Sequence, residues 1–215
     1  MFGEDDHKFE IIWVNVALYV YYHIAAFYGL LVPKTGGTHL VQLGMILLSA
    51  FGMTVGAHQL FAHRSFKANK KLKAMLIFMH TAFCLHSVHD YARYHRSHHK
   101  FIDTNADPHN SKRGFFFTHM GWLLAKKHEE FEKFSKKIDI KDILTDKMVM
   151  FQHKYFLVLG FLIGFALPVS ISWLFCGDSF ITALNYNCFR HILIFHIALS
   201  TNSISHRYGY RPFDK

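Results

Sequence analysis

Cysteine and proline are both scarce in this chain, which has three cysteines and four prolines among 215 residues. Cys84, Cys176 and Cys188 form no CxxC pair, so the sequence gives no reason to expect a disulfide framework or a thiolate metal site. Acidic residues are also few, with 15 aspartates and glutamates against 24 lysines and arginines. The HExxH motif of zinc proteases is absent, which argues against a membrane metalloprotease.

Long apolar segments are what the chain has instead. Hydrophobic residues make up 51% of the sequence and aromatic residues 17%, which is high for a soluble domain. Three uncharged segments approach the roughly 20 residues that cross about 30 Å of hydrocarbon. A fourth carries Arg190, His191 and His196, and should cross only if these groups find a cavity or a partner. The sequence therefore predicts an all-α integral membrane fold with four transmembrane helices, near residues 11–32, 40–57, 155–176 and 180–200.

The positive charge indicates how these helices are oriented. Of the 24 lysines and arginines, 18 lie within residues 58–154, whereas the connections near residues 33–39 and 177–179 carry only Lys34. Basic segments between membrane helices stay in the cytosol. We therefore expect one domain over residues 1–215, in which two helical hairpins carry a cytosolic helical cap at 58–154. Because this charge lies between apolar segments, we expect membrane lipid and no nucleic acid as a partner.

Histidine is abundant, with 18 residues, and five of the histidines are clustered. His58 and His63 are five apart at the cytosolic end of the second apolar segment. An ideal α-helix would point them about 140° apart, which suits two different metals, or one metal if the helix unwinds at its end. His95, His98 and His99 have i, i+3, i+4 spacing, which places three imidazoles on one helical face.

A further pair, Asn202 and His206, is four residues apart where the last apolar segment ends, so an amide and an imidazole share one face. Imidazole suits zinc, copper, iron and nickel alike. A single zinc takes four protein ligands, or three and a water. Six histidines from three separate segments therefore point to a site with two metals.

Isolated histidines have a simpler interpretation. His39, His128 and His153 are each far from another histidine in the sequence, and we expect them to be solvated or interfacial groups. The same interpretation is favoured for His86 and His89. The clustered histidines differ because, without a metal, they would repel one another on protonation.

The segments around the clustered histidines, which we call the histidine boxes, resemble those of a known family. GAHQLFAHRSFKA, RYHRSHHKF, TNADPHN with GFFFTHMGWLLAKKH, and NSISHRYGYRPFDK are similar to the animal stearoyl-CoA (delta-9) desaturases of the membrane fatty acid desaturase family, with insect-like features. The resemblance implies a multi-pass enzyme of the endoplasmic reticulum membrane whose histidine boxes face the cytosol. Such an enzyme uses O2, and electrons from cytochrome b5 and its reductase, to introduce a cis double bond into a saturated long-chain acyl-CoA.

The resemblance also implies roles for individual residues. Two iron ions would be held by His58, His63, His95, His98, His99 and His206, and by Asn202 through a water molecule. Contacts to the coenzyme A head group fall on Arg93, Lys126 and Lys127, in keeping with the need to pair phosphates with cations. Tyr91 and Ala198 fall on substrate-binding positions that contact the head group or shape the bend of the acyl tunnel.

The sequence also departs from the family pattern. The family has Trp at Tyr91, Asp at Tyr94, Asn at His86 and a Thr-Trp pair at 198–199, which leaves the position of the double bond open. A third box, HxxHH, lies beyond the YRPFDK segment in the family, whereas this sequence ends at Lys215. We therefore expect three ligands to be lacking and the 215-residue form to be inactive by itself. Two alternatives follow, namely a catalytically inactive truncated membrane paralogue or subunit and, less favoured by the boxes, a related di-iron hydroxylase.

Overall fold

The computed structural model describes residues 10–208, which are helical apart from loops and one bridge between Ile11 and Ala125. The elements in chain order are α1 (Trp13–Leu31), α2 (Gly36–Phe51), the π-helix η1 (Gly52–Ala62), α3 (Lys70–Thr81), α4 (Val88–Phe101), η2 (Ser111–Arg113), η3 (Phe117–Gly121), α5 (Trp122–Leu124), α6 (Glu129–Ser135), α7 (Lys141–Leu144), α8 (Lys147–Lys154), α9 (Phe156–Gly160), η4 (Phe161–Ala166), α10 (Leu167–Phe175) and α11 (Phe180–Arg207).

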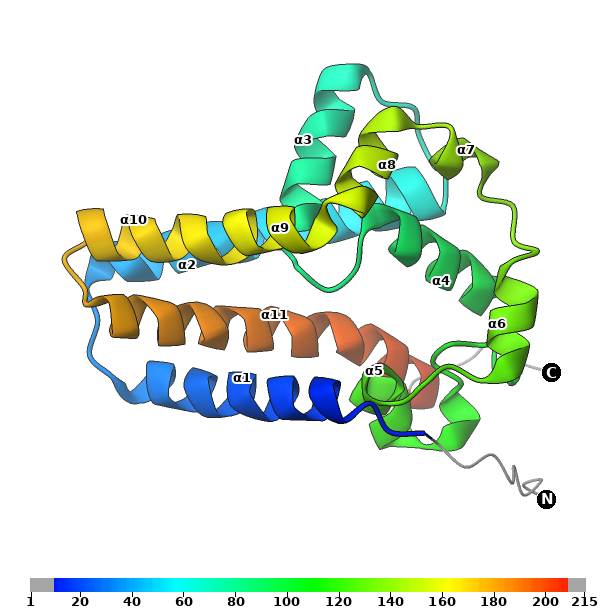
Figure 1. The fold of residues 1–215 in the computed structure, drawn as a ribbon, viewed down its shortest axis with the longest axis horizontal. Coiled ribbons are helices and arrows are strands. Elements are labelled where there is room, and N and C mark those ends of the chain that lie inside the picture. The colour runs from blue at the N-terminus through cyan, green and yellow to red at the C-terminus, as the bar shows by residue number, and fades with distance from the viewer. Residues whose placement is uncertain (1–9, 209–215) are drawn as a thin grey trace.

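Four long helical runs lie side by side in the molecule: α1, α2 continued by η1, α9 continued by η4 and α10, and α11 (Figure 1). The short helices α3 to α8 gather at one end of these runs, and the two tight turns lie at the other. Asp178 joins the two turns, because its carboxylate accepts a 3.1 Å hydrogen bond from the backbone N–H of Thr35. Gly177 adopts a φ of 80°, which a residue with a side chain rarely does, and so permits the second turn.

Several helices begin at a residue whose side chain caps the free backbone N–H groups. Thr35 accepts a hydrogen bond from the N–H of Thr38 at the start of α2, and Ser179 accepts one from the N–H of Thr182 at the start of α11. Ser87 does the same for α4, the helix that carries His95, His98 and His99. Local sequence therefore sets where the helices of the histidine boxes begin.

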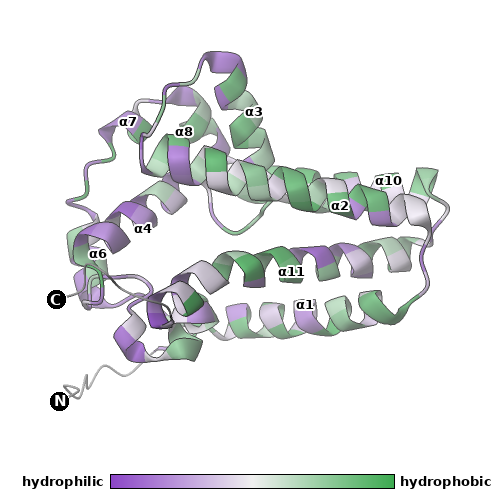
Figure 2. Ribbon diagram, turned by 180° about the vertical axis from the view of Figure 1, so that it is seen from behind, coloured by the Kyte–Doolittle hydropathy of each residue, from purple (hydrophilic) through white to green (hydrophobic). Residues whose placement is uncertain are grey.

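Three of the long runs are long and apolar enough to cross a membrane: Trp13–Leu31, Gly36–Ala62 and Phe156–Phe175. Figure 2 colours much of α2 as hydrophobic. Many large apolar side chains of these runs are exposed, among them Leu157 and Phe175 at 85% and 81%. Exposed apolar surface of this extent suits hydrocarbon rather than water. The all-α fold and the membrane class are thus confirmed, whereas the crossing by a fourth helix, α11, stays a prediction.

α11 packs against α1, α2 and α10 and buries polar groups among them. Arg190 is fully buried, and its guanidinium donates hydrogen bonds to the carbonyl oxygen of Gly164 at 2.7 Å and to Oδ1 of Asn187 at 3.2 Å. These neutral acceptors satisfy part of the guanidinium, while its Nη1 is buried without a hydrogen-bond partner among the described residues. α1 and α11 also approach closely, since a Cβ at Gly29 would lie 2.3 Å from the carbonyl oxygen of Asn185.

The end formed by α3 to α8 has its own apolar core. Helices α3, α4 and α8 pack against η1 or against one another. The side chains between them include Leu76 of α3, Val88 and Ala92 of α4, and Val149 of α8, all of which are completely buried. This core fixes α4 against η1, and so positions the two helices that carry the first two histidine boxes.

Candidate metal centre and adjoining cavities

Four imidazoles from the first two boxes meet where α4 packs on η1. Nε2 of His63 lies 3.1 Å from Nε2 of His58 and 2.8 Å from Nε2 of His95. Nε2 of His95 also lies 3.0 Å from Nε2 of His99. Each neutral imidazole has one N–H and one lone pair, so nitrogens that face two neighbours at once bring lone pairs together. A cation between them would remove this repulsion.

The separations also match the geometry of a metal site. Two nitrogens bound at about 2.1 Å to one ion, 90° apart, lie about 3 Å from each other. The ligand atoms of His58, His63 and His95 all lie within 4.8 Å of one another. Burial, together with the neighbouring imidazoles, lowers the pKa of His95 to about 2, so this side chain stays neutral and keeps a lone pair for a metal. The residues present therefore fit a metal ion.

The π-helix explains why His58 and His63 converge. The backbone N–H of His63 donates a 2.9 Å hydrogen bond to the carbonyl oxygen of His58, five residues earlier. A π-turn closes after five residues instead of four, so residues five apart lie on nearly the same face. The π-turn thus brings Nε2 of His58 and Nε2 of His63 within 3.1 Å of each other, instead of pointing the two imidazoles about 140° apart.

The three imidazoles of α4 divide between two groups. His95 and His99 face η1, whereas His98 lies toward α11, where its ring centroid is 5.0 Å from that of His206. The ring centroids of His95 and His98 are 6.4 Å apart, so the two groups are adjacent. Imidazoles from η1, α4 and α11 thus lie close together at one end of the long helices. The six predicted histidines lie in two neighbouring groups.

Asp107 and His109 complete the second group, and sequence reasoning did not single them out. Nδ1 of His98 donates a 2.9 Å hydrogen bond to Asp107, which leaves Nε2 of His98 for a metal, and the ligand atoms of all three residues lie within 4.8 Å of one another. Although burial alone would raise the pKa of Asp107, its contacts with His109 and His98 hold that pKa well below the usual value. A carboxylate behind a histidine fixes the ring orientation of a metal ligand. Both residues lie in the TNADPHN segment, whose resemblance to the family could have indicated them.

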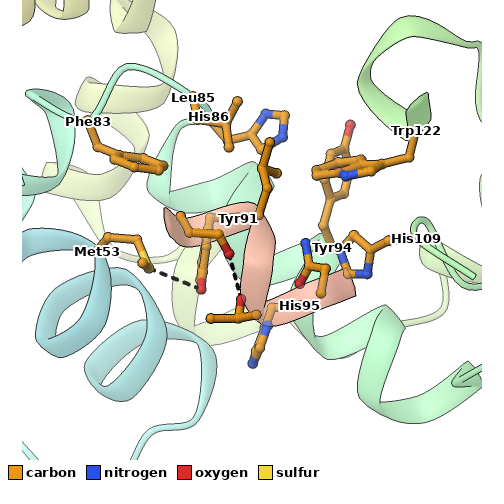
Figure 3. A pocket seen from close by; sticks show the side chains of 13 residues that line it. Met53, Phe83, Leu85, His86, Tyr91, Tyr94, His95, His109 and Trp122 are labelled. Carbon is orange, nitrogen blue, oxygen red and sulfur yellow. Dashed lines mark hydrogen bonds between the residues drawn. The ribbon is translucent and has the colours of Figure 1, made fainter. Parts of the chain in front are cut away.

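A cavity adjoins the first group and collects three other predicted residues. Tyr91, Ala198 and Asn202 line it together with His95. Figure 3 shows this cavity from close by, with Tyr91 and His95 labelled. The ring of Tyr91 stacks on that of His95, with the centroids 5.6 Å apart and the planes 12° apart. Anything bound in this cavity would lie against the histidine groups.

A second cavity, of about 410 Å³, has a basic wall formed by Lys126 and Lys127. Nζ of Lys127 donates a 2.6 Å hydrogen bond to the carbonyl oxygen of Trp122, and burial lowers the pKa of Lys127 to about 7. Lys126 is exposed and pairs with Glu10 at 2.6 Å. Arg93 lies beside this cavity, 5.4 Å from the ring centroid of Tyr94, which is part of the cavity wall.

A third cavity, of about 330 Å³, extends between α1, η4 and α11, with Tyr22 and Phe165 in its wall. His86 lines all three cavities. Burial lowers the pKa of His86 to about 3, so it is a neutral group inside the protein rather than the solvated one that the sequence favoured. His86 therefore lies where three features adjoin: the basic wall, the cavity beside the histidine groups, and the apolar space between the long helices.

The amino-acid sequence is similar to those of several known proteins. No family model matches it. Stearoyl-CoA desaturase 2 of Rattus norvegicus is 42% identical, with 97% of this chain and 59% of the relative covered. Acyl-CoA Delta-12 desaturase of Tribolium castaneum is 40% identical (97% and 60%), and stearoyl-CoA desaturase of Homo sapiens is 39% identical (97% and 59%). The chain thus spans about three fifths of the length of these curated relatives. Over 97% of its own length, the chain is similar in sequence to these named desaturases.

Proposed function

We propose that the chain is an oxygen-dependent acyl-CoA desaturase that introduces a cis double bond, at the delta-9 position, into a saturated fatty acyl chain. The observation that carries the proposal is the convergence of six box histidines from three separate elements beside a cavity. The desaturase relatives, at 39–42% identity, support it.

We propose that the histidine groups hold two iron ions. One would be bound by His58, His63, His95 and His99, and the other by His98 and His206, with Asn202 as a ligand through water. Neutral imidazoles are suitable ligands for iron. Bound iron would supply the oxidising chemistry that removes two hydrogens from unactivated carbons. Asp107 holds the ring of His98 in place through the hydrogen bond to Nδ1.

The cavities suggest how an acyl-CoA would bind. The phosphates of coenzyme A would pair with Lys126, Lys127 and Arg93 at the basic wall. The acyl chain would pass His86 and enter the apolar space between α1, η4 and α11. Tyr91 and Ala198 would hold the reacting carbons close to His95, because both line the cavity that His95 shares. Fixed positioning of this kind determines which carbons react.

We propose a membrane arrangement with four crossing helices in two hairpins and with the basic end in the cytosol. Both tight turns lie at the end opposite the histidine groups, which supports the hairpins (Figure 1). The burial of Arg190, whose Nη2 donates a hydrogen bond to the carbonyl oxygen of Gly164, supports the crossing by α11. The endoplasmic reticulum would be the site, and cytochrome b5 with its reductase would be the electron donors.

The test is to produce the protein in membranes, to count iron per polypeptide, and to assay stearoyl-CoA with cytochrome b5 and its reductase. Two irons with an unsaturated product would support the proposal and contradict the expectation that the 215-residue form is inactive by itself. Less than one iron and no product would instead favour the inactive membrane subunit, and a hydroxylated product the related hydroxylase. His39→Gln is the matched control for box variants such as His63→Gln, because His39 lies near the turns and contacts Tyr186 at the far end of the helices.

A further inference from the structure

A third group of metal-ligating side chains lies apart from the histidine boxes. His89 and Asp90 are in the first turn of α4, and His153 is near the end of α8. Nδ1 of His89 is 3.0 Å from Oδ1 of Asp90, and Nδ1 of His153 is 3.5 Å from Oδ2 of the same carboxylate. The ligand atoms all lie within 4.8 Å of one another. Both histidines had the sequence signature of isolated groups, and only the packing of α8 on α4 brings them together.

These distances suit a tetrahedral metal ion. Ligand atoms bound at about 2.0–2.1 Å in tetrahedral geometry lie roughly 3.3–3.4 Å apart. The two nitrogen–oxygen distances, 3.0 and 3.5 Å, lie on either side of that value. The ring centroids of His89 and His153 are 4.2 Å apart, so both imidazoles already face the same carboxylate. Small side-chain movements would complete a three-ligand site.

The kind of ligand indicates the kind of metal. Two imidazoles and one carboxylate, with a fourth position left to water, form a set that zinc takes in open sites. Magnesium and calcium prefer oxygen ligands throughout. Oγ of Ser87 donates a 2.9 Å hydrogen bond to Oδ2 of Asp90 and is hydrogen-bonded to Nδ1 of His153 at 2.8 Å. A metal ion on these two ligand atoms would replace both contacts, and Oγ could then bind a metal-bound water.

The surroundings leave the group accessible. The side chains of His89, Asp90 and His153 are 12%, 29% and 34% exposed, so an ion can reach them from solvent. Arg93 is the competing cation, but its guanidinium stays 4.0 Å from Oδ1 of Asp90, beyond hydrogen-bond distance. Arg93 therefore forms only a long ion pair with the Asp90 carboxylate and donates no hydrogen bond to its Oδ1.

We propose that His89, Asp90 and His153 form a zinc-binding site separate from the proposed iron centre. His89 precedes His95 by six residues, which is about 9 Å along the helix axis. Zinc bound here would join the start of α4, the helix of the second histidine box, to the end of α8, the helix that leads into α9. The site does not depend on the proposed desaturase function.

The experiment measures zinc binding to the purified, iron-loaded protein by titration with zinc chloride and by elemental analysis. We expect one zinc per chain in the unaltered protein and in the His39→Gln control. In His153→Gln and in Asp90→Asn we expect the affinity to fall by about 100-fold or more, because a ligand is lost. Cobalt should give the visible absorption of a tetrahedral site in the control and not in either variant.

Two results would overturn the site. One is equal zinc binding in all four proteins, and the other is a loss of iron together with zinc, which would place these residues in the iron centre. Asp90→Asn decides the matter if His153→Gln fails to fold, because the amide keeps the shape of the carboxylate and removes its charge. Normal zinc binding in a protein that holds less than one iron and forms no unsaturated product would support the zinc site and count only against the proposed function.

Discussion

Arg96→Ala would separate the first two histidine boxes. Arg96 lies on α4, between His95 and His98, and its guanidinium donates hydrogen bonds to the carbonyl oxygens of Phe61 and Ala62 at the end of η1. It also donates two hydrogen bonds to the carboxylate of Asp142 in α7. One side chain therefore ties η1 to α4 and α7, at the point where the imidazoles of the two boxes meet.

The expected cost follows from what the substitution leaves unpaired. The side chain of Arg96 is only 12% exposed, and each hydrogen bond to a charged group contributes about 1.5–3 kcal/mol, without simple additivity. We expect a loss of roughly 3 kcal/mol in the free energy of unfolding, since the carbonyl oxygens of Phe61, Ala62 and Asp139 lose a charged donor and the carboxylate of Asp142 keeps only Arg64. For a chain of this size, that lowers the melting temperature by roughly 6–12 °C. Arg64 binds the same carboxylate but is 48% exposed, so Arg64→Ala should cost about 1 kcal/mol or less.

The assay is thermal unfolding of both variants in the same detergent at one heating rate, because irreversible unfolding makes the midpoint depend on that rate. Iron affinity is the second readout, and it should fall about 10- to 100-fold in Arg96→Ala, as it does when support for metal ligands is removed. Equal losses in the two arginine variants, or an unchanged melting temperature in Arg96→Ala, would refute this reasoning.

Three further predictions concern packing, substrate binding and pH. Gly29→Ala should lower the melting temperature, because the new Cβ would lie 2.3 Å from the backbone of α11. Gly44→Ala should leave it unchanged, because nothing lies within 4 Å of a Cβ there. Equal shifts of the melting temperature in the two variants would contradict the close approach of α1 and α11. Binding of an acyl-CoA analogue should weaken as pH rises through about 7, because burial lowers the pKa of Lys127 to about 7 and its amine then loses its charge. Lys127→Arg should abolish this pH dependence. The same pH profile of binding in both proteins would count against a contact between Lys127 and the coenzyme A phosphates. Burial holds the pKa of His86 at about 3, against about 6.5 in an unfolded chain, so the unfolded state binds more protons below pH 6.5. Stability should therefore be lost as pH falls from 6.5 toward 3, by up to about 1.4 kcal/mol per pH unit from this group, and a slope unchanged in His86→Asn would exclude its contribution.

Properties that depend on sequence length and spacing could be predicted. The uncharged segment at residues 155–176 became α9, η4 and α10, and the i, i+4 spacing of His95 and His99 placed both imidazoles toward η1. The basic residues between the apolar segments likewise gathered at one end of the long helices. Each of these depends on local geometry or composition, which the sequence contains directly.

Properties that depend on packing or on an unusual helix could not be predicted. Because the π-turn at residues 58–63 breaks the 3.6-residue period, the angle calculated for an ideal helix was too large. His89 and His153 meet through the packing of α8 on α4, which no spacing in the sequence reveals. His86 was interpreted as a solvated group, but the helices enclose it in the walls of three cavities.

Iron K-edge X-ray absorption of the iron-loaded protein tests most directly whether the boxes share their metals. The convergence of His58, His63, His95 and His99 predicts scattering from several imidazoles per iron, and fewer imidazoles in His63→Gln than in His39→Gln. A shell made of oxygen ligands alone, or one that is the same in both variants, would contradict it.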